Sequence, residues 1–307
     1  MTISDINVTE LQKPVIKWVG GKHKIIGKLV ERFPSEINNY HEPFLGGGSI
    51  LLGLLGLIRQ NKIQVRGNIY AYDLNKPLIS MHKNIKENVI DLYEVCMQLL
   101  EDYDVIETIN GNKKPRTEEE GCSSKESYYY WIRKQFNDLE DKTSVLASAY
   151  FIFMNKTGFR GMYREGPNGM NVPYGHYVNV TFDLGDFQNV SELYQSVEFI
   201  HCDFSEALSR TEPDDFIYLD PPYVPVDDTS FVDYNRDGFG LDQHMNLFTE
   251  CRETLNDKKF MMSNSNTILV RDNFPEDRFN LILIDVRRAI NSVDPGQMVK
   301  ELLITNY

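Results

Sequence analysis

A glycine-rich loop between two strand patterns constrains the fold of this chain more than any other feature. The short stretch Glu42-Pro-Phe-Leu45 leads into Gly46-Gly-Gly-Ser49, and Ser49 is a good N-cap for the apolar segment Ile50–Ile58. Farther along, Asn68–Asp73 alternates in hydrophobicity as a strand does and ends on a carboxylate. The order strand, loop, helix and strand predicts a β-α-β unit, the building block of α/β folds.

The same alternation of strand and helix patterns recurs near the end of the chain. From about Lys76 to Val190 the patterns are helical, whereas after Val197 short apolar runs alternate with helical stretches. Candidate strands are Glu198–Cys202, Phe216–Leu219, Lys259–Met262, Leu281–Val286 and Leu302–Tyr307, and Leu241–Leu255 is a candidate helix. We therefore predict an N-terminal tail at 1–13, an α/β Rossmann-like sheet domain formed by 14–75 and 196–307, and a mostly helical inserted domain at 76–195.

Two segments of the insert differ sharply in composition. Glu107–Ser127 has almost no apolar residues and is rich in glycine, lysine, glutamate and serine, which predicts a mobile loop. Gly158–Gly175 has five glycines and two prolines among aromatic residues and arginines. That composition predicts an ordered hairpin or a compact loop.

Composition places the chain among soluble globular proteins. Of 307 residues 41% are hydrophobic and 25% are charged, which excludes disordered, collagen-like and coiled-coil classes. The longest apolar run, Ile50–Ile58, is far shorter than the ~20 residues that span a bilayer, and the N-terminus has no signal-peptide pattern. Four scattered cysteines suit reduced thiols. We expect an intracellular protein with no membrane partner, in a bacterial cytoplasm or a virus-infected host cell.

The net charge of −13 argues at first against a polyanionic partner. The charges are unevenly distributed, however. Residues 13–32 hold six lysines and arginines against Glu31 alone, and residues 150–182 hold three against Glu165. Two basic islands in an acidic chain leave nucleic acid open as a partner.

The motif Asp220-Pro-Pro-Tyr223 directly follows the candidate strand Phe216–Leu219. It should lie at that strand's carboxyl end, where open α/β sheets form their ligand crevice. Two prolines fix the backbone, so a carboxylate, a carbonyl and an aromatic face are presented together. A flat heteroaromatic amine would fit between them. Taken alone, the motif is equally compatible with a simple strand-ending turn.

The glycine loop points to a nucleoside ligand. Its backbone can approach a ligand closely at a helix N-terminus, and Asp73 at the next strand end is placed for ribose hydroxyls. The loop is not G-x-G-x-x-G and lacks the G-K-[ST] ending of a phosphate loop. A nucleoside without phosphates therefore fits better than a dinucleotide or a triphosphate.

Six motifs occur in the order seen in Dam-type (D12 class, α-group) DNA adenine-N6 methyltransferases, and residues 14 to 307 resemble that family. The motifs are Trp18-Val-Gly-Gly-Lys22, Glu42-Pro-Phe-Leu-Gly-Gly-Gly-Ser49, Asp73-Leu-Asn75, Asn155-Lys-Thr-Gly-Phe-Arg-Gly-Met-Tyr-Arg164, Asn171-Val-Pro-Tyr-Gly175 and Asp220-Pro-Pro-Tyr223. The resemblance implies a sheet domain that binds S-adenosylmethionine, an inserted target-recognition domain, and methyl transfer to adenine N6 in double-stranded DNA.

The resemblance also assigns residues to the cofactor and to the chemistry. Asp220, Pro221, Pro222 and Tyr223 are the implied catalytic residues, and S-adenosylhomocysteine is the implied product. The implied cofactor residues are Trp18, Gly20, Gly21, Lys22, Glu42, Pro43, Phe44, Gly46, Gly48, Ser49, Asp73, Leu74, Asp203, Phe204 and Asp220. For each the alternative is core packing or a solvated charge, above all for Lys22. The activated sulfonium needs no metal, and the six histidines form no H-E-x-x-H motif.

Recognition of the DNA sequence falls to the insert. An aromatic residue, two arginines and a methionine between glycines suit a wedge into a base step and readout of guanine. By similarity, the base-contacting positions are Lys17, Phe159, Arg160, Met162 and Arg164. A hairpin whose arginines meet only phosphates or solvent is the alternative. Because N6 is unreachable inside a stacked duplex, we expect the target base to be flipped out.

The best-known family members recognise GATC and carry asparagine where this chain has Arg160. The stretch Phe159–Pro167 looks more like relatives that methylate CATG, so a four-base palindrome is expected with both sequences as candidates. A restriction endonuclease acting on the same site is a candidate partner. The sequence leaves open the restriction-linked, solitary or viral role and the oligomeric state.

Three other functions compete with this hypothesis. Two are methyltransferases for other unreactive nitrogens, in RNA adenine or in protein glutamine. Relatives acting on glutamine usually have Asn in place of Asp220 and lack the insert. The third is an inactive DNA-binding relative, against which the intact catalytic and cofactor motifs argue.

Overall fold

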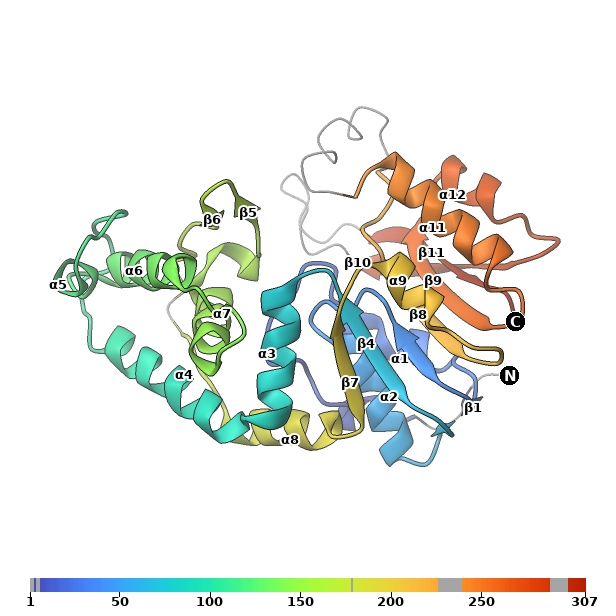
Figure 1. Ribbon diagram of the computed structural model, residues 1–307, viewed down its shortest axis with the longest axis horizontal. Coiled ribbons are helices and arrows are strands. Elements are labelled where there is room, and N and C mark those ends of the chain that lie inside the picture. Colours follow the sequence, from blue (N-terminus) through green and yellow to red (C-terminus); the bar gives the residue numbers. More distant parts are fainter. Residues whose placement is uncertain (1–2, 4–5, 178, 226–238, 288–297) are drawn as a thin grey trace.

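A computed structural model describes residues 3, 6–177, 179–225, 239–287 and 298–307 (Figure 1). Its centre is a seven-stranded sheet with the order β10-β11-β9-β8-β2-β4-β7. The strands are β2 (Tyr40–Glu42), β4 (Ile69–Asp73), β7 (Val197–His201), β8 (Phe216–Leu219), β9 (Lys259–Ser265), β10 (Asn280–Arg287) and β11 (Met298–Thr305). The strands from β9 to β7 run parallel, whereas β11 is antiparallel to both β9 and β10. The predicted α/β class is confirmed.

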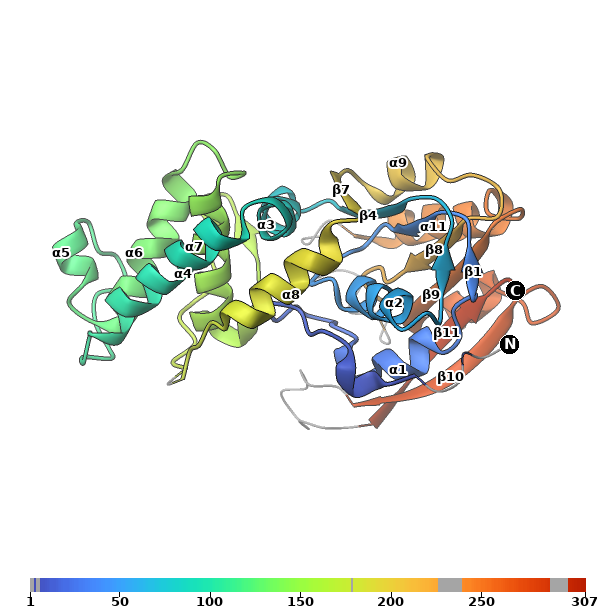
Figure 2. The same ribbon diagram turned by 90° about the horizontal axis from the view of Figure 1, so that it is seen from below.

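Helices cover both faces of this sheet. Figure 2 shows α1 and α2 on one face and α9 and α11 on the other. The covering helices are α1 (Ile26–Val30), α2 (Ser49–Arg59), α9 (Phe204–Ser209), α11 (Leu241–Glu253) and α12 (Ile268–Asn273). All four residues of β8 are fully buried, because a parallel strand between two helical layers has no face toward water. The near-continuous apolar run in the sequence has this cause.

The direction of winding reverses at β2. From β2 the chain moves outward through β4 to β7 and then crosses back to β8 on the other side of β2. In such sheets the crevice outside the carboxyl ends of the strands at the switch point holds the ligand. Glu42 ends β2 and Asp220 follows β8, so the fold places both carboxylates at this crevice.

The middle of the chain is mostly helical, as the patterns predict. It contains α3 (Lys76–Glu87), α4 (Val89–Asp104), α5 (Glu118–Gly121), α6 (Lys125–Asp138), α7 (Val145–Thr157) and α8 (Leu184–Tyr194). The nearly all-apolar α7 is central and packs against α3, α4 and α6. Figure 1 shows α4 to α7 as a lobe beside the sheet. Because α3 packs against β7 as well as α7, the boundaries of the domains stay predictions.

The segment Gly158–Gly175 forms the predicted hairpin. Its strands are β5 (Glu165–Gly166) and β6 (Gly169–Met170), and its base is closed by a bridge between Gly158 and Tyr174. A 3-10 turn, η3 (Phe159–Gly161), opens it. Two more 3-10 turns, η1 (Val8–Glu10) and η2 (His23–Ile25), and the small strand pair β1 (Glu36–Ile37) and β3 (Gln64–Val65) complete the described elements.

Two local expectations need correction. The residue that caps α2 is Gly48, with a φ of +78°, and Ser49 is already the first helical residue. The helix begins one residue early because glycine adopts this left-handed conformation without strain. Glu107–Ser127 is not a structureless loop, since it contains α5 and the start of α6. Thr117 and Ser124 cap these helices with their side chains, a local signal that outweighs the polar composition.

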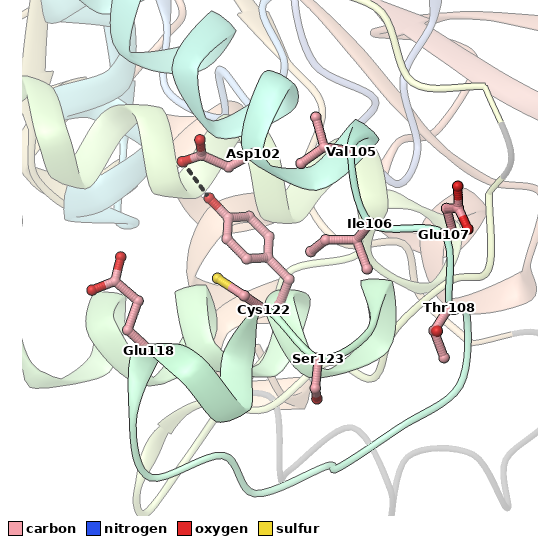
Figure 3. Close-up of a pocket in the computed structure, with 9 residues that line it drawn as sticks. Asp102, Val105, Ile106, Glu107, Thr108, Glu118, Cys122 and Ser123 are labelled. Carbon is pink, nitrogen blue, oxygen red and sulfur yellow. Dashed lines mark hydrogen bonds between the residues drawn. The ribbon is translucent and has the colours of Figure 1, made fainter.

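A cavity of about 560 Å³ lies at the end of α4, beside α5 and α6 (Figure 3). The Tyr128 hydroxyl donates to Asp102 Oδ2 at 3.2 Å within it. Its lining residues are Asp102, Val105, Ile106, Glu107, Thr108, Glu118, Cys122, Ser123 and Tyr128. None of them is a predicted site residue.

Candidate active site at the carboxyl ends of β2, β4 and β8

Asp220 forms a largely buried ion pair with Lys22. The Lys22 ammonium lies 2.7 Å from Asp220 Oδ2 and also donates to the Gly20 carbonyl at 2.8 Å. The two side chains are 6% and 18% exposed for Lys22 and Asp220. The alternative that Lys22 is a solvated surface charge is therefore wrong.

The second oxygen of Asp220, Oδ1, is buried and has no hydrogen-bond partner among the residues that the structure describes. Burial raises the pKa of Asp220 above its ordinary value, and both the neighbouring Lys22 ammonium and the Tyr223 hydroxyl act in the opposite direction. A buried carboxylate oxygen without a donor is costly. The geometry therefore leaves a strong acceptor available to a ligand.

Tyr223 ends the turn Asp220–Tyr223, called the Asp220 corner below, and is half-buried. The Lys22 ammonium lies 5.0 Å from its ring centroid, and its hydroxyl donates to Glu301 Oε2 at 2.9 Å. Pro221 is buried and Pro222 is exposed. Sequence reasoning missed Glu301, although a charged residue beside the apolar run 302–304 was the available signal.

The glycine loop closes around Asp73. The Gly46 amide donates to Asp73 Oδ2 at 3.0 Å, and the Asn75 amide donates to Oδ1 at 2.9 Å. Gly46 has a φ of +52°, and a Cβ there would lie 2.8 Å from Trp18 Cδ1. Glycine is required at this position because both the backbone and the close indole exclude a side chain. The structure thus brings Trp18, Gly46 and Asp73 together, and their role toward a cofactor stays a prediction.

Three carboxyl groups meet at the strand ends. Glu42 is 2% exposed and accepts a hydrogen bond from the Tyr40 hydroxyl at 2.7 Å. Burial raises the pKa of Glu42 well above its usual range, and Asp220 and Asp73 raise it further against the effect of Tyr40. Burial likewise raises the pKa of Asp73 despite its backbone donors. A cationic ligand would relieve this concentration of acidic groups.

The other side of the crevice carries apolar surfaces. Leu74, directly after β4, is 70% exposed. Phe44 stacks on Phe204 with ring centroids 5.7 Å apart. Asp203 caps α9 by accepting from the Glu206 amide at 2.8 Å. The exposed Leu74, next to the carboxyl groups at the strand ends, suits one edge of a flat ring.

The end of α7 and the Gly158–Gly175 hairpin lie beside the residues that precede the crevice. The Asn155 side chain accepts from the Lys17 amide at 2.9 Å and donates to the carbonyls of Lys17 and Gly161 at 2.6 and 2.8 Å. Trp18 stacks on Tyr163 with ring centroids 6.3 Å apart. Trp18 also touches the glycine loop. It therefore links the crevice to the predicted base-reading loop, residues 159–164.

The predicted base-reading side chains are presented outward. Phe159 is 43% exposed, Arg160 and Arg164 are exposed, and Met162 is half-buried. Arg160 has a φ of +57°, and its amide donates to the Tyr177 hydroxyl at 3.0 Å. Arg164 Nε donates to Asn171 Oδ1 at 2.7 Å. The anchoring role of Tyr177 was missed, because no local pattern marks it.

Across the described residues, no group of three or more His, Cys, Asp or Glu side chains is placed to hold a metal ion. Within the same part of the chain no helix has the length and apolar character needed to span a bilayer.

Comparison with known proteins gives concordant matches. A family model described as D12 class N6 adenine-specific DNA methyltransferase matches residues 18–290. The Type II methyltransferase M.MjaIII of Methanocaldococcus jannaschii is 33% identical over 311 residues, covering 96% of this chain and 99% of that protein. The Type II methyltransferase M1.LlaDCHI of Lactococcus lactis subsp. cremoris is 28% identical, covering 96% and 95%. The DNA adenine methylase of Haemophilus influenzae is 28% identical, covering 94% and 91%.

Proposed function

The chain belongs to the D12 class of N6 adenine-specific DNA methyltransferases, and from this membership we propose that it methylates adenine N6 within one short palindromic site of duplex DNA. S-adenosylmethionine is the methyl donor, and CATG and GATC are the candidate sites. The observation that carries the proposal is the Asp220 corner. There, one carboxylate oxygen is held by Lys22, while the other is buried and has no donor within the described part of the chain.

The donor set of the crevice fits S-adenosylmethionine. Glu42 and Asp73 are buried carboxyl groups with raised pKa values, and a ligand that carries a sulfonium and an ammonium would stabilise their ionised forms. In this proposal Asp73, at the end of β4, binds the ribose, and the exposed Leu74 and the edge of the largely buried Phe204 contact the adenine. When bound, the sulfonium supplies an already activated methyl group. The protein then has to position the acceptor nitrogen in line with it.

Asp220 and Pro221 prepare the acceptor nitrogen. The lone pair of an adenine amino group is delocalised into the ring, so N6 is a poor nucleophile. Asp220 Oδ1 and the Pro221 carbonyl can each accept a hydrogen bond from one of its two N–H groups, which draws N6 toward a tetrahedral geometry. When the methyl group moves to N6, S-adenosylhomocysteine is released and the one proton that N6 loses passes by way of Asp220 to solvent. Oδ1 is available for this because Lys22 engages only Oδ2.

The target adenine has to leave the duplex to reach this corner. Stacked bases do not expose N6 to a buried carboxylate, so the base is flipped out and stacks on the half-buried Tyr223. Phe159 and Met162 act as apolar wedges in the base step, while Arg160 and Arg164 read guanine in the major groove. Lys17 lies beside this loop and joins the contact.

Two similar proteins are named Type II methyltransferases. We therefore propose a restriction-modification context, in which a restriction endonuclease acting on the same site is the partner. Under this proposal the methylated site of this protein equals the cleavage site of that partner.

The test is to incubate fully unmethylated genomic DNA with the protein and S-adenosylmethionine, and to map N6-methyladenine by single-molecule sequencing. The expected result is methylation of one short palindrome and no methylation by Asp220→Ala. Cofactor binding without DNA methylation would contradict the proposal. The same protein would then be assayed on RNA adenine and protein glutamine.

A further inference from the structure

The catalytic corner receives a contact from a strand that holds no predicted site residue. The Tyr223 hydroxyl donates to Glu301 Oε2 at 2.9 Å. Glu301 lies on β11 and is 8% exposed. Buried glutamates usually have specific partners, and the Tyr223 hydroxyl is one partner of this carboxylate.

The backbone after Tyr223 is held by other residues. The Val224 amide donates to Asn264 Oδ1 at 3.1 Å, and Ser265 Oγ donates to the Val224 carbonyl at 2.6 Å. Both residues are on β9, and Ser265 is the register partner of Glu301. The main chain of the corner is therefore fixed without Glu301.

The side chain of Tyr223 still has two rotatable bonds once its backbone is fixed. Lys22 lies over one face of the ring, 5.0 Å from its centroid, but a contact over a face leaves rotation in the ring plane and tilting open. The bond to Glu301 fixes the far end of the ring. Together these contacts give the ring one orientation before any ligand binds.

We propose that Glu301 is a positioning residue for methyl transfer, because it fixes the plane of Tyr223 against which the target adenine stacks. The inference rests on the proposed function, in which Tyr223 is the stacking partner. A ring already in its working orientation loses no further freedom when the base arrives. It also keeps N6 aligned with the Asp220 acceptor.

The test is a double-mutant cycle on single-turnover methyl transfer at saturating DNA and cofactor. Glu301→Ala and Tyr223→Phe each remove the same hydrogen bond from opposite ends. Each should lower the rate roughly tenfold. Because Tyr223→Phe also removes the hydroxyl that acts on Asp220, the loss in the double variant should be clearly smaller than the product of the two single losses without being equal to either one. Glu301→Gln keeps an acceptor oxygen and should stay within about threefold of the unmodified protein.

A control variant and a second readout separate a positioning role of Glu301 from a structural one. Thr305→Val is the matched control, since Thr305 is a buried polar residue on the same strand whose hydroxyl donates to the Tyr307 carbonyl at 3.2 Å. It should leave the rate unchanged. A DNA site with 2-aminopurine at the target position should show weaker fluorescence change with Glu301→Ala and Tyr223→Phe alike.

Additive losses in the cycle, or a Glu301→Ala rate within twofold of the unmodified protein, would overturn the inference. Tyr223→Ala distinguishes this failure from failure of the proposed function. If Tyr223→Ala is inactive and the cycle is additive, only the role of Glu301 is wrong. If Tyr223→Ala methylates at the full rate, the stacking role of Tyr223 is wrong and the role of Glu301 is lost with it.

Discussion

The Asp220–Tyr223 corner and the Gly158–Gly175 hairpin are held in opposite ways. The corner follows a fully buried strand, and its carboxylate is 18% exposed. The hairpin has two strands of two residues each, and its Phe159 is 43% exposed. The corner cannot move without disturbing the sheet, whereas the hairpin presents its side chains to the outside. Changes at the corner should therefore alter the rate on every DNA, and changes in the hairpin should alter which DNA is used.

The largest effect is expected from Asp220→Ala. Loss of the N6 acceptor should reduce methyl transfer by at least about 1000-fold on any DNA, while cofactor affinity stays within a few-fold. Single-turnover rates and calorimetric titration with S-adenosylmethionine measure the two quantities. Asp220→Asn keeps the volume beside Lys22 but removes the charge, so it separates the effect of a lost carboxylate from that of an empty space. Equal loss of binding and turnover would make Asp220 a cofactor-binding or structural residue instead.

In the hairpin, Arg160→Ala should change the choice of site rather than the chemistry. One good contact from arginine to guanine contributes roughly 1–3 kcal/mol to discrimination, so kcat/KM at the preferred site should fall about 5- to 150-fold. The map of methylated adenines should show one relaxed base position. Arg66→Ala removes a 63% exposed arginine from the sheet part and is the matched control. An unchanged methylated motif would refute the reading role.

A smaller effect is expected on the pH dependence of the methyl-transfer rate, which tests the charges of the Asp220 corner. Burial raises the pKa of Asp220, and Lys22 partly counteracts this. If the carboxylate form is the acceptor, the single-turnover rate falls as the pH drops through that raised pKa. Lys22→Met removes the counteracting charge, so the pKa of Asp220 rises further. The acidic limb of the pH–rate profile therefore moves to higher pH. A limb that stays in place, or moves to lower pH, would exclude Asp220 as the titrating group.

The sequence predicted the corner and the sheet because their signals are local. An apolar run followed by Asp-Pro-Pro-Tyr gives β8 and its carboxyl end, and the glycine loop gives the turn beside Asp73. The partners of the corner could not be predicted in the same way. Lys22 and Glu301 lie 198 and 78 positions from the residues they contact, and nothing in a local pattern joins such distant positions.

The contacts that attach the hairpin to the helices could not be predicted from local sequence either, although they join positions closer together in the chain. Its glycines and prolines predicted the turn, but not the helix side chains that attach it. The amides of Asn155 and Asn137 bond to main-chain groups of the hairpin, and Tyr129 and Arg133 both donate to the Val172 carbonyl. Asn155 was part of the family motif. Asn137 lies at the end of a helix with no distinguishing pattern, and only the fold brings it to Met170.

The smallest effect is expected from Asn137→Ala, and it tests whether the hairpin depends on its polar attachment. Asn137 Nδ2 donates to the Met170 carbonyl at 3.0 Å, and Oδ1 accepts from the Met170 amide at 2.8 Å. Loss of both bonds should loosen β6 by about 1–3 kcal/mol. The base-reading loop at the base of the hairpin would then lose part of its order in the free protein and regain it when DNA binds. The KM for DNA should therefore rise a few-fold.

The rate at saturating DNA should stay close to that of the unmodified protein, because the corner lies on the sheet and does not depend on this bond. Asn280→Ala is the matched control, since its side chain also bonds to a carbonyl, that of Tyr307, but on an exposed part of the sheet. Steady-state kinetics on one cognate duplex separate KM from kcat. If Asn137→Ala lowers kcat as strongly as it raises KM, the two regions are coupled, and the division between a rate-setting corner and a site-choosing hairpin does not hold.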